Sequence, residues 1–166
     1  MVKLTKTQAG VGDISEIIDL AERMWLPAFS PYFSETELYS LFNGMYNSEK
    51  ILAAIQNPSY EFYIVENLQH MRVGYFATYK TIEYLKLDKI YVAPELKGRG
   101  IGKWMYNEII EQARQNNFRK ILLNVNRRNR PAINFYKKLG FKVVKEEDIP
   151  GPNGFIYDDF VMEVEI

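Results

Sequence analysis

The chain has 166 residues, of which 47% are apolar and 25% charged, as expected for one globular domain that buries a core of its own. Its 21 basic residues balance its 21 acidic residues, so no net charge directs the protein toward nucleic acid or an anionic membrane. Cysteine is absent and His70 is the single histidine, which excludes disulfides and cysteine nucleophiles and argues against a bound metal. No apolar run has the length of a membrane span and the N-terminus does not resemble a signal peptide, so we expect a cytoplasmic protein.

The first half of the chain predicts a strand, three helices and a three-strand meander. A helix begins at Asp13, which is expected to cap it, with Glu16 completing a capping box, and Pro27 and Pro31 are expected to break it. Two shorter helices, each opened by a serine, follow it. The predicted ranges are a strand at 2–7, helices at 13–25, 34–46 and 48–55, and strands at 60–66, 72–81 and 85–92.

The second half alternates helices and strands. A strong helical pattern starts at Ile101, a strand follows at 120–126, and a short helix at 130–140 stops at Gly140. Two closing strands at 141–147 and 155–164 enclose a loop of turn-forming residues. This order describes a single mixed α/β domain over 1–166 without repeats or linkers.

Three glycines, Gly98, Gly100 and Gly102, stand at the entry to the helix that begins at Ile101. A glycine-rich turn into a helix exposes backbone N–H groups at the positive end of the helix dipole, where an anion binds well. The letters do not fit a P-loop, and the dinucleotide fingerprint would need glycine where Lys103 stands. The glycines therefore predict an anion site of a different kind.

Residues 97–102, KGRGIG, resemble the pyrophosphate loop of the GCN5-related N-acetyltransferases (GNAT), whose usual form is Gln/Arg-x-x-Gly-x-Gly/Ala. Gly100 and Gly102 match that form, and Lys97 replaces the usual first residue. Further along, residues 129–141 resemble the second signature of the family, with matches at Asn129, Ala132, Phe135, Tyr136, Gly140 and Phe141. The resemblance implies one mostly antiparallel mixed sheet of about seven strands, flanked by about four to five helices and splayed between the fourth and fifth strands.

The resemblance also implies acetyl-CoA as the acetyl donor. It implies that the fourth strand pairs with the pantetheine arm and that Tyr136 protonates the departing sulfur as general acid. From the residues alone, Asn129 would cap the helix that follows it, and Tyr136 would pack in the core. The implied cofactor contacts are Ile90, Tyr91, Val92, Lys97, Gly98, Arg99, Gly100, Ile101, Gly102, Lys103, Asn129, Ala132, Phe135 and Tyr136.

The base that deprotonates the acceptor is less defined. Lys86 stands where many members of the family carry a glutamate on the fourth strand. Asp88 lies two residues further, hence on the same face of a regular strand, and is the predicted base or amine anchor. A water chain or Tyr136 itself stays open as a replacement.

Residues 24–42, 48–66 and 158–166 resemble the PaiA-type branch of the family, which implies a polyamine acceptor such as spermidine or spermine. Acidic and aromatic side chains suit such a cation. The candidates are Tyr32, Glu35, Glu37, Glu83, Tyr84, Asp158 and Asp159. A protein or peptide N-acetyltransferase and a CoA-binding regulatory protein stay open as alternatives, as does a homo-oligomer, whereas the basic run at 127–130 alone does not predict a nucleic-acid partner.

Overall fold

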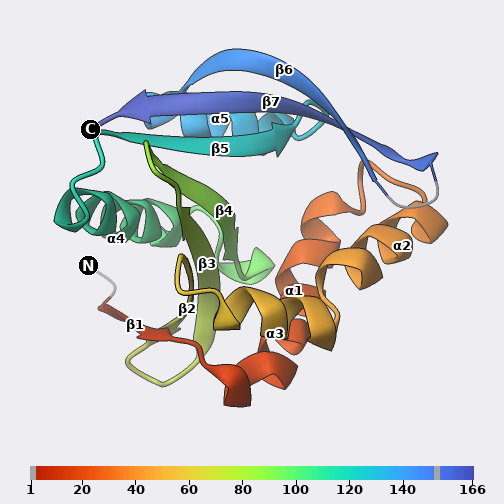
Figure 1. The fold of residues 1–166 in the computed structure, drawn as a ribbon. Coiled ribbons are helices and arrows are strands. Elements are labelled where there is room, and N and C mark those ends of the chain that lie inside the picture. Colours follow the sequence, from red (N-terminus) through yellow and green to blue (C-terminus); the bar gives the residue numbers. More distant parts are fainter. Residues whose placement is uncertain (1–2, 152–153) are drawn as a thin grey trace.

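In the part of the chain that the structure describes, seven strands form one mixed sheet in the order β1-β2-β3-β4-β5-β7-β6 (Figure 1). The structure is a computed structural model that describes residues 3–151 and 154–166. Every neighbouring pair is antiparallel except β4 and β5, which run parallel. The strands are β1 Leu4–Gln8, β2 Tyr60–Asn67, β3 Arg72–Lys80, β4 Leu85–Val92, β5 Lys120–Asn126, β6 Lys142–Pro150 and β7 Ile156–Glu165.

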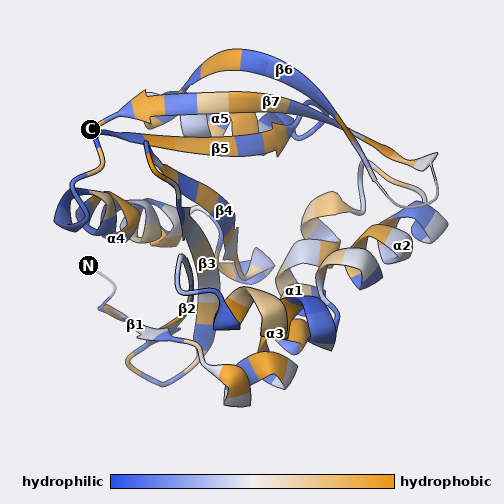
Figure 2. Cartoon of the chain, viewed as in Figure 1, coloured by the Kyte–Doolittle hydropathy of each residue, from blue (hydrophilic) through white to orange (hydrophobic). Residues whose placement is uncertain are grey.

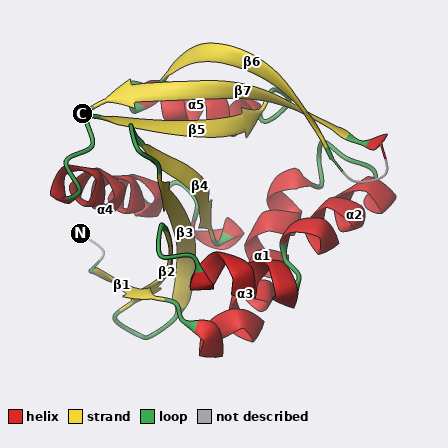
Figure 3. Cartoon of the chain, in the orientation of Figure 1, coloured by secondary structure: helices red, strands yellow, loops and turns green. Residues whose placement is uncertain are grey.

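Within the described residues, five α-helices cover the two faces of this sheet (Figure 3). They are α1 Ile14–Phe29, α2 Glu35–Met45, α3 Ser48–Gln56, α4 Ile101–Gln115 and α5 Arg130–Lys138. In the part of the chain that the structure describes, no helix is both long and apolar enough to cross a membrane. The observed order of elements confirms the mixed α/β fold that the sequence predicts.

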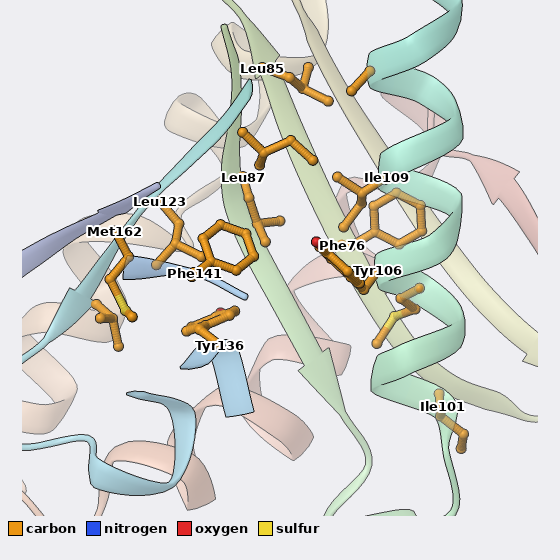
Figure 4. Close-up of a cluster of buried hydrophobic side chains, with 14 of the residues drawn as sticks. Phe76, Leu85, Leu87, Ile101, Tyr106, Ile109, Leu123, Tyr136, Phe141 and Met162 are labelled. Atoms are coloured by element: carbon orange, nitrogen blue, oxygen red, sulfur yellow. The ribbon is translucent and has the colours of Figure 1, made fainter. Parts of the chain in front are cut away.

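The sheet separates two hydrophobic cores. One is built by α4 and α5 on the strands, and Tyr136 of α5 lies in it beside Phe141, with Leu123 and Met162 close by (Figure 4). The other is built by α1, α2 and α3 against the opposite face. Hydrophobic and hydrophilic segments alternate along β7, whereas β6, the edge strand beside it, is almost entirely exposed (Figure 2).

β4 and β5 are paired only at their beginnings. Leu85–Leu87 align with Ile121–Leu123, and β4 then continues to Val92 with no strand partner on that side. The backbone of the second half of β4 is therefore free to bind something other than a strand. This is the splay that the resemblance implies.

A β-bulge changes which side chains of β4 share a face. Thr78 of β3 pairs with Leu87, and the preceding residue of β3, Ala77, pairs with Lys89, so Asp88 is the extra residue. A regular strand would direct Asp88 and Lys89 to opposite faces. Both instead reach the side covered by α1–α3, where Asp88 contacts Tyr60 of β2.

Two predictions about α1 are wrong. The helix passes through Pro27 and ends at Phe29, because a proline removes only one N–H and the buried side chains of Met24 and Trp25 hold the helix in place. Asp13 makes no side-chain cap, because its carboxylate accepts from the N–H of Gly10 at 2.7 Å.

The other helix starts follow the predictions more closely. Ser34 caps α2 and forms a capping box with Glu37, as its serine predicts. α3 is capped by Asn47 rather than Ser48, since the Asn47 side chain accepts from the N–H of Lys50 at 2.9 Å. The predicted loop of the last hairpin is shorter than expected, because β6 extends to Pro150; its residues 152–153 lie outside the described part of the chain.

Candidate active site

The glycine-rich loop lines a cleft of about 520 Å³, called the glycine cleft below, between α1, the end of β4, the start of α4 and α5. Gly98 and Gly100 have φ of 80° and 83°, which only glycine adopts freely, while an added Cβ at either would meet nothing within 4 Å. Conformation, and not crowding, therefore requires glycine at these two positions. Gly100 offers no side-chain cap, so the first amides of α4 remain available to a ligand.

The glycine cleft brings together nearly all the residues that the resemblance implies for the cofactor. Only Arg99 lies outside its lining, exposed in the loop. At Gly102 an added Cβ would come within 3.3 Å of Phe135, so this glycine allows α4 to lie close to α5. The implied residues that line it are Ile90, Tyr91, Val92, Lys97, Gly98, Gly100, Ile101, Gly102, Lys103, Asn129, Ala132, Phe135 and Tyr136.

A second cavity of about 530 Å³, called the inner cavity below, adjoins the glycine cleft. Five residues line both spaces and are called the shared wall below: Ile90, Tyr91, Asn129, Ala132 and Tyr136. Aromatic side chains of α1, of the loop that follows it, of the C-terminal end of α2 just beyond Met45 and of β7 form much of the remaining surface. They are Trp25, Phe29, Phe33, Tyr46 and Tyr157.

Tyr136 is placed in the shared wall by the start of α5. Asn129 caps this helix, since its side chain accepts from the N–H of Ala132 at 3.3 Å, which confirms the cap predicted from the sequence. The Tyr136 ring is 8% exposed and packs edge-on against Phe135 and Phe141, with centroids 5.5 and 5.6 Å away. Burial raises the pKa of its hydroxyl, so the group is protonated at neutral pH and available as a proton donor.

Three carboxylates line the inner cavity, and their surroundings differ. Burial alone would raise the pKa of Asp88, but the Lys89 ammonium at 2.9 Å and the Tyr60 hydroxyl at 2.7 Å outweigh it, so the pKa of Asp88 is lowered. Asp159 behaves in the opposite way, because burial and then the neighbouring Asp158 raise its pKa against the hydrogen bond from Asn124. Asp159 therefore binds a proton more readily than Asp88 does.

Two further charged side chains of the inner cavity, Glu147 of β6 and Lys86 of β4, both contact Asn124 of β5. Hydrogen bonds, first from Lys145 and then from Asn124, lower the pKa of Glu147. Lys86 donates to the side-chain oxygen of Asn124, and burial lowers the pKa of Lys86 although nearby carboxylates oppose the shift. Among the described residues, no cluster of three or more His, Cys, Asp or Glu is arranged to hold a metal ion.

Of the acceptor residues suggested by the sequence, the inner cavity contains Asp159. Tyr32 lines the glycine cleft instead. Asp158 lies outside both spaces, where it accepts from Asn126 at 3.2 Å and lies 3.8 Å from Arg128. Of these three residues, Asp159 is the one that a molecule bound in the inner cavity would meet.

The other four suggested residues lie outside both spaces. Glu35 is exposed at the first turn of α2, and Glu37 serves as its capping residue. Glu83 and Tyr84 belong to the β3–β4 turn, where their N–H groups bind the hydroxyl of Thr81. Neither element borders the inner cavity at these residues.

Several side chains of the inner cavity were not suggested by the sequence. They are Tyr46, Lys89, Asn124, Glu147 and Tyr157. Asn124 carried a usable signal, because it interrupts the apolar strand 120–126. The others come from different elements and had no local signal.

Residues 16–141, more than half of the chain, match the profile of the Acetyltransferase (GNAT) family. The chain belongs to this family. Over 92% of its length it is 27% identical to spermidine N(1)-acetyltransferase of Thermoplasma acidophilum, of which the match covers 91%. Its fold is similar to that of the PaiA N-acetyltransferase of the same organism, solved in complex with coenzyme A, with a TM-score of 0.82 at 23% identity over 99% of each chain. It is also similar in fold to the ribosomal-protein-S18-alanine N-acetyltransferase of Escherichia coli, with a TM-score of 0.73 at 17% identity over 99% of this chain and 94% of that one.

Membership of the GNAT family makes the chain an acyltransferase that draws its acetyl group from acetyl-CoA. The residues fit that donor, because the glycine cleft presents free helix amides between Lys97 and Lys103, as a pyrophosphate requires. The unpaired half of β4 lies beside the same cleft, where it is free to meet the pantetheine arm. The expected fold and cofactor are thereby confirmed.

Proposed function

We propose that this GNAT enzyme transfers the acetyl group of acetyl-CoA to a primary amine of a small polyamine, such as spermidine or spermine. The observation that carries the proposal is the inner cavity, which adjoins the glycine cleft and combines Asp88, Glu147 and Asp159 with aromatic walls. Alkylammonium groups gain from carboxylates and from aromatic faces at once. The similarity to a spermidine N(1)-acetyltransferase supports the same class of acceptor.

We also propose direct transfer within a ternary complex. The two spaces adjoin at Ile90 and Tyr136, which line both, so a donor in one space and an acceptor in the other would meet beside these residues. The sequence contains no cysteine that would carry the acetyl group as a thioester between two half-reactions. Both substrates are therefore expected to be bound before the acetyl group moves.

The proposed proton transfers use two side chains. When bound, acetyl-CoA supplies an activated acetyl thioester. Asp159 accepts a proton from the acceptor ammonium, directly or through water, because its raised pKa suits a base better than the lowered pKa of Asp88. Asp88 is already paired with the Lys89 ammonium, and the hydroxyl of Tyr136 donates a proton to the departing sulfur.

The cavity walls support a small acceptor more than a peptide. The ring of Phe33, in the loop after α1, packs edge-on against the ring of Phe155 beside β7, with the ring centroids 5.6 Å apart. The guanidinium of Arg128 donates to the carbonyl of Tyr32 at 3.2 Å. β6 and β7 extend beyond the rest of the sheet toward α1 and α2 (Figure 1). The two contacts and the long hairpin of β6 and β7 connect the elements that surround the cavities. A peptide acetyltransferase would instead need an open groove beside the donor site.

The experiment incubates the protein with acetyl-CoA and a panel of acceptors while free thiol is followed. The panel contains putrescine, spermidine, spermine, a peptide with an N-terminal alanine and a peptide with an internal lysine. Turnover of the polyamines and not of the peptides supports the proposal. Turnover of the peptides alone would replace it with a protein acetyltransferase, and CoA binding without any turnover would replace it with a regulatory protein.

A further inference from the structure

A third cavity, called the side cavity below, lies behind the inner cavity and has a volume of about 300 Å³. Most of its lining consists of apolar side chains, such as Ile51 and Ile55 of α3 and Phe62 of β2, and Lys50 of α3 lines it as well. Four residues line both the side cavity and the inner cavity, and so form a partition between them. They are Met45, Tyr46, Asp88 and Lys89.

The partition already contains an ammonium group. The Lys89 Nζ lies 2.9 Å from Asp88 Oδ2 and 5.3 Å from the centroid of the Tyr46 ring. A carboxylate and an aromatic face are the two partners that an alkylammonium ligand prefers. The chain's own lysine therefore occupies a site that would otherwise accept an ammonium group of the substrate.

The two partners are held by contacts that do not depend on Lys89. Asp88 accepts from the hydroxyl of Tyr60 at 2.7 Å. Tyr46 shares a 2.8 Å hydrogen bond with Tyr75, and its ring is stacked on Phe42 with centroids 5.3 Å apart. Removal of the Lys89 ammonium would thus leave the carboxylate and the ring in position.

The β-bulge of β4 explains why the lysine can reach this site. Because Asp88 is the extra residue, Asp88 and Lys89 extend to the same side of the sheet. The Lys89 side chain is 18% exposed and the Asp88 side chain 39%, so the carboxylate remains accessible to a ligand.

We propose that Lys89 determines which polyamines the enzyme accepts, by holding the place of a substrate ammonium and closing the inner cavity toward the side cavity. This inference rests on the proposed function. An amine whose chain ends before the partition is accepted, while a longer amine must displace the Lys89 ammonium from Asp88 and Tyr46. Without that ammonium, an inner ammonium of a long amine binds Asp88, and the part of the amine chain beyond it extends into the side cavity.

The test replaces Lys89 by methionine, which keeps the length of the side chain and removes its charge. The kcat/KM for spermine, divided by that for putrescine, should rise about tenfold in Lys89→Met, as a gained ammonium–carboxylate contact implies. Lys86→Met is the charge-matched control: it also removes a cation from the inner cavity, but one that donates to Asn124 and not to Asp88, so any change should affect both amines alike. In Lys89→Met combined with Asp88→Asn the gain should disappear.

Binding and stability keep the inference testable apart from turnover. Calorimetry on the CoA-loaded protein should give a lower Kd for spermine, but not for putrescine, in Lys89→Met. If that variant does not fold, Lys89→Gln keeps a donor to Asp88, and a smaller change in the same direction is expected. An unchanged spermine-to-putrescine ratio and an unchanged spermine Kd would overturn the role of Lys89. Wild-type protein that turns over no polyamine would overturn the proposed function instead, and the calorimetric comparison would still decide the role of Lys89.

Discussion

At the scale of single residues, the inner cavity assigns different tasks to groups of similar chemistry. Asp88 and Asp159 line the same space, yet neighbouring groups lower the pKa of Asp88 while burial raises that of Asp159. The chemical role of each group therefore depends on its surroundings more than on its residue type.

Replacement of Tyr136 by phenylalanine should lower kcat by about 10²–10³, because general-acid catalysis of this kind contributes on that order. The loss should be partial, since a thiol with a pKa of about 8.5 is already a fair leaving group. The Kd for CoA should stay the same, as the ring still packs on Phe135 and Phe141. Steady-state kinetics and CoA titration measure the two quantities, and unchanged kcat across the pH range would exclude Tyr136 as the acid.

The pH dependence of kcat/KM tests Asp159. Its carboxyl must be ionised to accept a proton, so activity should rise with pH through a pKa above the ordinary range of Asp. Asp159→Asn should remove this acid limb together with most of the rate. Asp158→Asn removes a neighbouring charge that raises the pKa of Asp159, and should move the limb to lower pH. A limb that stays in place in both variants would contradict the assignment.

At the scale of elements, local irregularities in the backbone build the site. The splay of β4 from β5 frees the backbone beside the glycine cleft, and the bulge in β4 brings Asp88 and Lys89 to one side. The left-handed conformations of Gly98 and Gly100 direct the chain into α4. The splay interrupts the hydrogen bonding between strands, and the bulge interrupts the alternation of side chains along β4. Each of these irregularities lies where a ligand is expected.

Gly100→Ala should weaken acetyl-CoA binding about tenfold, because a Cβ at φ of 83° costs about 1–2 kcal/mol and the loop must shift to relieve it. Gly12→Ala is the matched control, since that glycine is also surrounded by open space but its φ lies outside the left-handed region. Fluorescence or calorimetric titration with acetyl-CoA compares the two variants. Equal affinity in both would mean that the conformation of Gly100 does not shape the cleft.

At the scale of the whole molecule, the sheet joins two halves that α4 and α1–α3 cover from opposite sides. Polar groups beneath α4 connect three elements: Glu61 of β2 pairs with Lys80 of β3 at 2.5 Å and accepts from Gln112 of α4 at 2.6 Å. Gln112 also accepts from the buried Thr78. This network links α4, whose first turn lies at the glycine cleft, to the central strands.

The stability of the protein toward acid should depend on Glu61. Burial raises its pKa, but hydrogen bonds from Lys80, Tyr63 and Gln112 outweigh it, so the pKa is lower in the folded than in the unfolded state. The resulting stabilisation is present above the unfolded pKa, about 4.3, and is lost as the pH falls through the folded value. Urea unfolding of Glu61→Gln at pH 7 and below should show a weaker pH dependence than wild type in that window. A parallel pH dependence in both proteins would refute this role.

The sequence by itself determined the donor side of the enzyme. The glycines of residues 97–102 and the pattern of residues 129–141 are each contiguous, so local spacing identified the anion-binding loop and Asn129 as a cap, and the family resemblance implied Tyr136 as a cofactor contact. The acceptor side was decided only by the tertiary structure. Asp88, Glu147 and Asp159 come from β4, β6 and β7, and the sheet order brings them to one cavity. Strand alternation could not foresee Lys89 there, because the bulge that redirects it depends on the pairing of β4 with β3, which is a non-local property.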